Sequence, residues 1–581
     1  MKLEKYDKYL LLLILASVCV SLIAHFYDYT FYKGDFIING WSRTYDVPEH
    51  LIYTIEILRG NWPFQNPMIV GASINYPIAF SLLVAIFVRI SGAPVLQVFR
   101  FFSIALIIFV GLTSYIMVSS LFNNKRIAFY TTLFVLFSGG YGWVTVLFPF
   151  LGLPRSIDFF PYYYCMIDTF FFYSILISVN LFRPLSRTLG IGLFYFYFYF
   201  LNSFLKSNKS KYLVFDGIVL GVLINSSPGM AIELFILSIM ALVYFKQSLH
   251  NILKYFLIHF AILPVFTIQL LLESVSGTLT GSMVINPGRY ISPIFYTSLF
   301  GIAFVLMIIG ILFYPMKEKK TRNFLYLWLL IALFLANVAL IAMRVQSTIS
   351  VLLLANSHIF SLLLNVPFYI FSSLGLVKIL DFKPSTKWST PWHFFRRYGV
   401  PLLIIACSLS VLRMVYINGY AVNDLSTAQI VYTAQEQEYT ALIWVRENTE
   451  LDAMFLTYHY TDLEATRIAK HPISVGRGHS WVADIGQRRV LLNRQGHFLI
   501  RGIDYREFLR IGSDIDLIYT TADIQHAIEV IKTYPISYIY VGPDELQQYG
   551  DGVNKFENQN YFERIYFNDL VKIYRLKPEL T

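Results

Sequence analysis

The stretch TYDVPEHLIYTIEILRGNWPFQNP, residues 44–67, is the most informative part of this chain. It lies between the first hydrophobic segment and the next long apolar run, and it carries an aspartate, two glutamates, a histidine and an arginine. A connector that only had to turn the chain would be short. The length and charge of this stretch therefore indicate a loop with a task of its own.

Within this stretch, the residues DVPE (46–49) are typical of a helix start. Asp46 is a good N-cap, proline is tolerated in the first turn, and the glutamate three residues later completes a capping-box pattern. Gly60 would end the helix, and Pro63 follows it. The pattern predicts an amphipathic helix of about three turns.

One face of this helix would be apolar, and it would contain Val47, Leu51, Ile55 and Leu58. The opposite face would carry the polar side chains of Glu49, Tyr53 and Glu56. We therefore expect the helix to lie along the outer surface of a membrane.

The composition identifies a membrane protein. Of the 581 residues, 56% are hydrophobic and only 14% are charged, and the mean hydropathy is +0.56. Many windows exceed the roughly 18 apolar residues that mark a membrane-spanning helix. The net charge of +10 comes from short lysine and arginine clusters between hydrophobic segments, which is typical of cytoplasmic loops and excludes nucleic-acid binding. The three cysteines show no CxxC or Cys/His spacing, so the sequence implies no disulfide framework and no structural zinc site.

The hydrophobic pattern predicts a polytopic α-helical protein with about 11–13 transmembrane helices. The expected spans are about 9–25, 97–121, 127–150, 188–205, 211–224, 229–245, 253–272, 293–314, 323–343, 357–377 and 399–416. Two further stretches, about 77–90 and 160–182, are ambiguous. With a cytoplasmic N-terminus, the basic connectors at 123–126, 206–211, 246–254, 316–322 and 378–397 all fall on the cytoplasmic side. The C-terminal region would then lie outside.

Two domains are expected. Residues 1–418 would form the transmembrane domain, with outer loops at about 26–96 and 151–187, and residues 419–581 a soluble extracytoplasmic α/β domain. In the latter, helices are predicted at 433–448 and 522–534, and strands at 453–457, 536–542, 562–567 and 570–576. The protein would be integral to a plasma membrane.

Several short motifs together resemble the GT-C superfamily of membrane glycosyltransferases, including protein O-mannosyltransferases. In the first outer loop these are D-x-x-x-H (Asp46, His50), G-x-x-P (Gly60, Pro63) and NYP (75–77). In the tail, VGRGHSW, YIYVG before PDELQQY, and the closing VKIYRL are similar to the soluble tails of such proteins. The resemblance implies the GT-C fold and sugar donors attached to polyprenyl phosphate. The W-W-D-Y-G motif expected of oligosaccharyltransferases is absent from the sequence, which argues against sequon-directed N-glycosylation.

The resemblance also implies roles for the acidic residues. Asp46 matches the outer-loop acid that would act as general base on an acceptor hydroxyl, and Asp35 is the alternative in the same loop. Asp158 is the candidate for a second acid in a later outer loop. His50 could orient the base, or bind a divalent metal such as Mg or Mn together with Asp46. The other interpretations stay open: Asp46 as a helix cap alone, and Asp158 as a loop acid paired with Arg155.

The donor phosphate requires a cation. Arg344 and Arg289 both fall at the expected outer ends of spans, where arginine binds phosphate with a forked geometry. Snorkelling to the membrane interface is the alternative for both. In the tail, the polar and aromatic cluster of Arg477, His479 and Trp481 could contact an acceptor, or form an ordinary loop around a buried tryptophan.

The sequence therefore predicts a glycosyltransferase that moves a sugar from a polyprenyl-phosphate donor to a glycan, lipid or protein acceptor outside the cytoplasm. A transporter or lipid flippase is the alternative, although no inverted repeat is visible and few charges lie within spans. A third hypothesis is a non-enzymatic factor in cell-envelope assembly.

Overall fold

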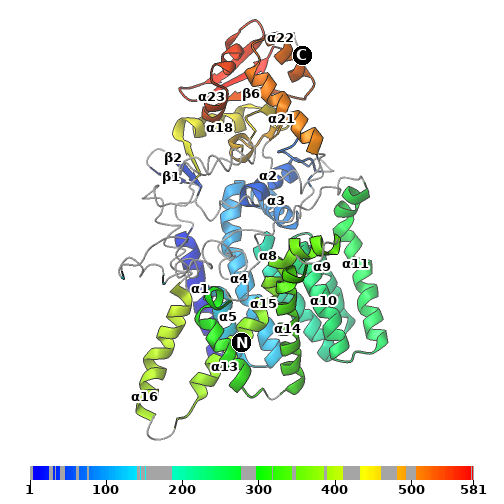
Figure 1. Cartoon of the computed structure of the whole chain (residues 1–581), viewed down its shortest axis with the longest axis vertical. Helices are drawn as coiled ribbons and strands as arrows, with labels where there is room; N and C mark the ends of the chain where they lie inside the picture. The colour runs from blue at the N-terminus through cyan, green and yellow to red at the C-terminus, as the bar shows by residue number, and fades with distance from the viewer. Residues whose placement is uncertain are drawn as a thin grey trace. The chain divides into compact units, whose positions relative to one another are not determined.

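The computed structural model of the chain divides into two compact units. Figure 1 shows their helices and strands, coloured from the N-terminus to the C-terminus. The first unit comprises Met1–Ala24, Arg100–Ile268 and Met283–Ile417, and the second comprises His25–Phe99, Gln269–Ser282 and Asn418–Thr581. The structure describes residues 4–24, 30–32, 35–38, 46–60, 64–72, 74, 78–139, 144, 151, 186–275, 296–316, 318–342, 348–384, 389–409, 432–459, 480–492, 505–577 and 579.

Helices build the first unit. They are α1 (Lys5–Ala24), α4 (Val95–Phe122), α5 (Lys125–Phe137), α8 (Ser186–Ser207), α9 (Ser210–Ile224), α10 (Pro228–Tyr244), α11 (Leu249–Val275), α12 (Tyr296–Phe300), α13 (Ile302–Phe313), α14 (Lys319–Ala342), α15 (Thr348–Asp381) and α16 (Ser389–Phe394), which continues as the π-helical η6 (Phe395–Gly399). The first residues of α4 and the last of α11 belong to the second unit.

Five helical segments in the described residues are long and apolar enough to cross a membrane. They are Lys5–Ile23, Val95–Phe122, Arg187–Ser207, Leu249–Thr267 and Leu363–Asp381. The predicted polytopic α-helical membrane fold is therefore confirmed. The total of about 11–13 spans stays a prediction, because parts of several expected spans lie outside the described residues.

Two expected boundaries can be compared with the structure. The span predicted at 127–150 begins as expected, but its helix, α5, ends at Phe137. The ambiguous stretch 77–90 forms α3 (Ala79–Ser91), which at 13 residues is about 20 Å long and shorter than a hydrocarbon core of about 30 Å. The ambiguous stretch 160–182 lies outside the described residues.

Glycines allow α13 and α15 to approach backbone to backbone. A Cβ atom on Gly310 would collide with the carbonyl oxygen of Phe371, and one on Gly375 would collide with that of Leu306. Such close contact between helices is typical of membrane bundles, where small residues replace the hydrophobic driving force with van der Waals packing.

Ion pairs join three segments at one end of the helical bundle. Lys125 Nζ lies 2.8 Å from Asp7 and 3.2 Å from Glu4, and Arg126 lies 2.8 Å from Asp381. The N-terminus, the turn before α5 and the end of α15 therefore share one end, as the predicted topology requires. The side of the membrane on which this end lies stays a prediction.

A five-stranded sheet forms the centre of the second unit, in the order β5 (Arg489–Val490), β4 (Met454–Leu456), β6 (Tyr538–Val541), β8 (Lys572–Leu576) and β7 (Phe562–Phe567). The strands β5, β4 and β6 are parallel to one another. The strand β8 runs antiparallel to both of its neighbours, β6 and β7. Its helices are α18 (Glu436–Asn448), α20 (Trp481–Asp484), α21 (Tyr505–Thr520), α22 (Ile524–Lys532), α23 (Pro543–Tyr549) and the 3₁₀-helix η9 (Gly550–Glu557). The predicted C-terminal α/β fold is confirmed.

A second, three-stranded sheet joins the two ends of this unit. It has the order β1 (Thr30–Tyr32), β2 (Asp35–Ile38) and β3 (Tyr432–Gln435), with both pairings antiparallel. Because β2 lies between α1 and α2 in the sequence and β3 directly precedes α18, distant parts of the sequence share one backbone ladder.

The first outer loop also contributes to the hydrophobic core of the second unit. The buried loop side chains Ile52, Tyr53, Met68, Ile69, Ile74 and Ile78 belong to the same cluster as residues of the five-stranded sheet, such as Phe455, Ile539 and Ile573. The helix α2 (Asp46–Arg59) is thus part of a folded core.

Candidate functional site

The helix α2 forms as the sequence predicts. It begins at Asp46 and runs for 14 residues to Arg59, and Gly60 follows with a φ of 81°, a left-handed conformation that glycine adopts without strain. The structure places the backbone of Asp46 at the first position of the helix.

The expected exposure of α2 is wrong. Both Tyr53 and Glu56, which the pattern assigned to a solvent-facing polar side, have 0% of their surface exposed. Residues 50–56 are all buried, so the helix does not lie with one face in solvent. The physical reason is that the C-terminal α/β fold covers the polar side and supplies partners for its charge.

His50 joins α2 to α3. Its Nδ1 lies 3.0 Å from Ser81 Oγ, and the Ser81 hydroxyl donates to the His50 carbonyl oxygen at 3.2 Å. Since that hydroxyl already donates, it accepts from His50 Nδ1–H. Thr54 also donates to the His50 carbonyl at 2.6 Å. These contacts fix the middle of α2.

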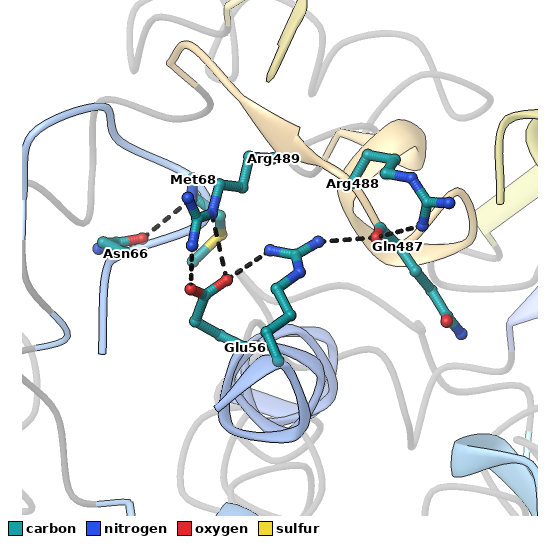
Figure 2. A network of polar contacts seen from close by, with 7 residues as sticks. Glu56, Asn66, Met68, Gln487, Arg488 and Arg489 are labelled. Atoms are coloured by element: carbon teal, nitrogen blue, oxygen red, sulfur yellow. Dashed lines mark hydrogen bonds and ion pairs between the residues drawn. The ribbon is translucent and has the colours of Figure 1, made fainter. Parts of the chain in front are cut away.

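Glu56 lies between two arginines (Figure 2). Arg489, from β5, donates to both carboxylate oxygens, with Nε 3.3 Å from Oε2. Arg59, one helical turn further along α2, donates to Oε2 and also to the carbonyl oxygen of Gln487 at 2.9 Å. Burial lowers the pKa of Arg59, while the charge of Glu56 raises it. The site therefore concentrates positive charge around a single buried carboxylate.

The loop after α2 extends the edge of the five-stranded sheet. Val490 N–H donates to the Pro67 carbonyl at 2.9 Å, and Val70 N–H donates to the Leu491 carbonyl at 3.1 Å. Ile69 and Leu492 form an antiparallel bridge. Residues 66–72 thus cover the otherwise open edge of β5 and hold the first outer loop against it.

A second polar cluster lies at the carboxyl ends of β4 and β6. Asp516 of α21 lies 3.3 Å from His459 Nε2 and accepts from the Tyr549 hydroxyl at 2.8 Å. Burial would raise the pKa of Asp516, but His459 and Tyr549 hold it below its usual value. Glu545 accepts from Tyr458 N–H and Gly542 N–H, and its burial beside Asp544 raises its pKa to about 7.

The other predicted site residues have these places. Asp35 is the first residue of β2, where it pairs with Gln435 of β3. Trp481 is the first residue of α20 and is buried. Several predicted residues lie outside the described residues: Asp158, Arg289, Arg344, Arg477 and His479.

In the part of the chain that the structure describes, no group of three or more histidine, cysteine, aspartate or glutamate side chains could hold a metal ion. Sequence reasoning missed the role of Glu56 and did not single out Arg489. The available signal was the arginine pair in GQRRVLL (486–492), whose charges directly precede an apolar run.

Comparison of the sequence with family models and with curated proteins finds no match. By fold the chain is similar to the mycobacterial arabinofuranosyltransferase AftD, with a TM-score of 0.53 and 12% identity over 99% of this chain and 40% of that one. It is also similar to ArnT from Cupriavidus metallidurans in the apo state, with a TM-score of 0.51 and 10% identity over 100% and 99% of the two chains. The oligosaccharyltransferase of Archaeoglobus fulgidus, in complex with Zn and sulfate, matches with a TM-score of 0.49 and 14% identity. The match covers 97% of this chain and 73% of that one.

Proposed function

We propose that this protein, which has the GT-C glycosyltransferase fold, moves a sugar from a polyprenyl-phosphate donor to an acceptor outside the cytoplasm. Its fold is shared with AftD, an arabinofuranosyltransferase, at 12% identity. The observation that carries the proposal is the way the first outer loop is built into the C-terminal α/β fold. A helix that begins at an acidic residue is held rigidly by His50 and Glu56, which is the preorganisation that a catalytic group requires.

In the proposed reaction Asp46 acts as general base. Its carboxylate takes the proton of an acceptor hydroxyl while that oxygen attacks the anomeric carbon of the donor sugar. The bond between the anomeric carbon and the phosphate oxygen breaks, and the leaving phosphate keeps the electron pair. A single displacement of this kind inverts the anomeric centre.

The remaining assignments belong to the same proposal. Asp35 and Asp158 are the alternative acids. Arg344 and Arg289 would bind the donor phosphate, since guanidinium groups stay charged near lipid. Arg477, His479 and Trp481 would contact the acceptor. A divalent metal at Asp46 and His50 is an open alternative.

Transfer by the purified full-length protein in nanodiscs tests the proposal, with a panel of polyprenyl-phosphate sugars and with or without a chelator. Asp46→Asn and Asp46→Ser are the decisive variants, because asparagine and serine cap a helix about as well as aspartate but cannot act as the base. We expect both to lose roughly 10²–10⁴-fold in rate while keeping the wild-type unfolding temperature.

If both variants keep full activity, Asp46 is not the base, and Asp35 and Asp158 are tested next. If only the chelator abolishes transfer, the metal alternative is supported. If the wild-type protein transfers no sugar from any donor to any acceptor offered, the proposed function is overturned for those donors.

One observation favours the alternative of a transporter or flippase. Asp216, Glu233 and His259 are buried in helices of the first unit, and ionisable groups inside membrane helices often mark transport pathways. Flipping of a fluorescent polyprenyl-phosphate lipid in proteoliposomes distinguishes this function. Asp216→Asn would abolish flipping by a transporter and leave sugar transfer by a glycosyltransferase intact.

A further inference from the structure

The contact between Glu56 and Arg489 is more than charge neutralisation of a buried group. One guanidinium is enough to balance the charge of a carboxylate, and Arg59, three residues away on the same helix, already donates to Glu56. Arg489 adds a second positive charge in a site where Glu56 is fully buried and Arg489 nearly so. Burying an excess charge is unfavourable, so electrostatics alone does not explain why this arginine is there.

What Arg489 adds is a mechanical connection. It belongs to β5, where it pairs with Met454 of β4, so its backbone is part of the five-stranded sheet. Its side chain reaches a helix whose sequence position differs by 433 residues. A fork of two guanidinium hydrogen bonds fixes both the distance and the orientation of a carboxylate.

The neighbouring Arg488 shows the contrast. It is as deeply buried as Arg489, but its side chain bonds only within its own part of the fold. It donates to Thr449 Oγ1 at 2.9 Å and to the carbonyl oxygens of Thr449, Arg446 and Gln487 at 2.6–3.0 Å. Two adjacent arginines therefore have different tasks, and only one of them reaches α2 (Figure 2).

With Arg489 in place, side-chain hydrogen bonds hold α2 at His50, at Glu56 and at Arg59, whose guanidinium donates to the Gln487 carbonyl at 2.9 Å. His50 is fixed to Ser81 of α3, and Glu56 is fixed to β5. Without Arg489, Glu56 is no longer tied to β5, and a tilt of α2 about His50 is opposed by the bond from Arg59 to Gln487 in place of a two-bond fork. Asp46 lies four residues from His50, about 6 Å along the axis, so a tilt of about 10° would move its backbone by about 1 Å. A misplacement of that size can reduce a reaction rate about 10²-fold.

We propose that Arg489 is a positioning residue that makes the C-terminal α/β fold set the place of the candidate base. This inference rests on the proposed function, because it assigns to Arg489 an effect on the reaction through Asp46. It gives the C-terminal fold a part in the chemical step that does not depend on contact with any substrate.

The test compares Arg489→Gln with Arg488→Gln in the full-length protein in nanodiscs. For Arg489→Gln, Glu56 keeps Arg59 as a partner, so the local charge remains balanced. We expect kcat to fall roughly 10–100-fold with the KM for the donor changed less than about 3-fold. Peptides that cover residues 46–60 should exchange their amide hydrogens faster.

Arg488→Gln is the matched control, since it removes an equally buried arginine from the same strand edge. We expect it to lower the unfolding temperature at least as much, while kcat and the hydrogen exchange of α2 stay within about 3-fold of wild type. Arg489→Lys keeps the charge without the fork and should restore part of kcat. If Arg489→Gln does not fold, Arg489→Lys is measured in its place.

Equal losses of kcat in the Gln variants at 488 and 489 would overturn the inference, because stability alone would then explain them. Unchanged hydrogen exchange of α2 in Arg489→Gln would also overturn it. Failure of the proposed function would be seen separately, because the wild-type protein itself would then transfer no sugar. In that case faster exchange in Arg489→Gln supports the positioning of α2, and unchanged exchange overturns it.

Discussion

Glu56 and Asp216 are both completely buried carboxylates, and the two units balance them in different ways. Glu56, in the second unit, lies between the guanidinium groups of Arg59 and Arg489. Asp216, in α9 of the first unit, lies near the tyrosines Tyr197 and Tyr255 and beside His259, whose Nε2 is 3.6 Å from Oδ2. In the part of the chain that the structure describes, neither oxygen of Asp216 has a hydrogen-bond partner.

The hydrogen bonds around His259 assign its protons. Its Nδ1 lies 2.8 Å from the carbonyl oxygen of Tyr255, which can only accept, so Nδ1 carries a hydrogen. A neutral His259 would then present the lone pair of Nε2 to Asp216. A bond between them requires one proton, held either by the carboxyl group or by the ring.

The neighbouring hydroxyl groups are already committed to one another. Ser238 donates to the Leu234 carbonyl at 2.7 Å, so it accepts from Tyr197, which lies 2.7 Å away. Tyr197 in turn accepts from Tyr255 at 2.8 Å. The comparison teaches that the second unit balances a buried carboxylate with two permanent cations, whereas the described part of the helical bundle places a histidine and tyrosines, and no permanent cation, beside Asp216.

The largest effect is expected from Glu56→Gln. This change leaves two arginines buried beside an uncharged amide, and removing one partner of a buried ion pair typically costs about 3–5 kcal/mol. Thermal unfolding of the protein in detergent, followed by intrinsic fluorescence, measures the loss. Glu56→Asp, which keeps the charge, is the control and should lose less; equal stability of Glu56→Gln and wild type would break the comparison.

Another buried carboxylate, Glu545, sharpens the comparison because, among the described residues, its hydrogen-bond donors are the backbone N–H groups of Tyr458 and Gly542 and include neither a cation nor a histidine. Its pKa is raised to about 7 in the folded protein. The unfolded chain therefore releases this proton first, and stability falls as pH rises from about 4.5 to about 7, by on the order of 3 kcal/mol, and is then constant.

The unfolding temperature of Glu545→Gln, measured against pH, should lack this component of the wild-type profile. Asp544→Asn is the control, because it removes a nearby negative charge and should reduce the pH dependence without abolishing it. Identical profiles for wild type and Glu545→Gln would show that this carboxyl group does not titrate in the expected range.

The smallest effect is expected from Asp216→Asn. The amide is nearly isosteric and donates an N–H to the lone pair of His259 Nε2, so we expect a change of less than about 1 kcal/mol. Thermal unfolding of the same preparation measures it, with Asp216→Leu as a control that leaves His259 without a partner. A loss as large as that of Glu56→Gln would show that Asp216 carries a charge that the bundle needs.

Local signals made much of the fold predictable. The strands at 562–567 and 570–576, the helix at 522–534 and the start of α2 all follow from alternation, capping residues and glycine, which depend on neighbours in sequence. The helix α21 was missed, although Phe508, Ile511, Ile515 and Ile518 recur at helical spacing.

What could not be predicted depends on distant partners. Glu56 has the pattern of an exposed residue until Arg489 is placed beside it, and β2 gives no local sign that it pairs with β3. The roles of Asp46, Asp35, Asp158, Arg289, Arg344, Arg477, His479 and Trp481 stay predictions.

The attachment of the first outer loop to β5 has a consequence for how the protein is made. Ribosomes add about 5–20 residues per second, so the 433 positions between Glu56 and Arg489 correspond to about 20–90 s of synthesis. Throughout that interval the nascent loop carries a carboxylate without Arg489, and apolar side chains whose core does not yet exist. Biogenesis of this protein therefore requires that the loop be kept from aggregating until the last quarter of the chain emerges to receive it.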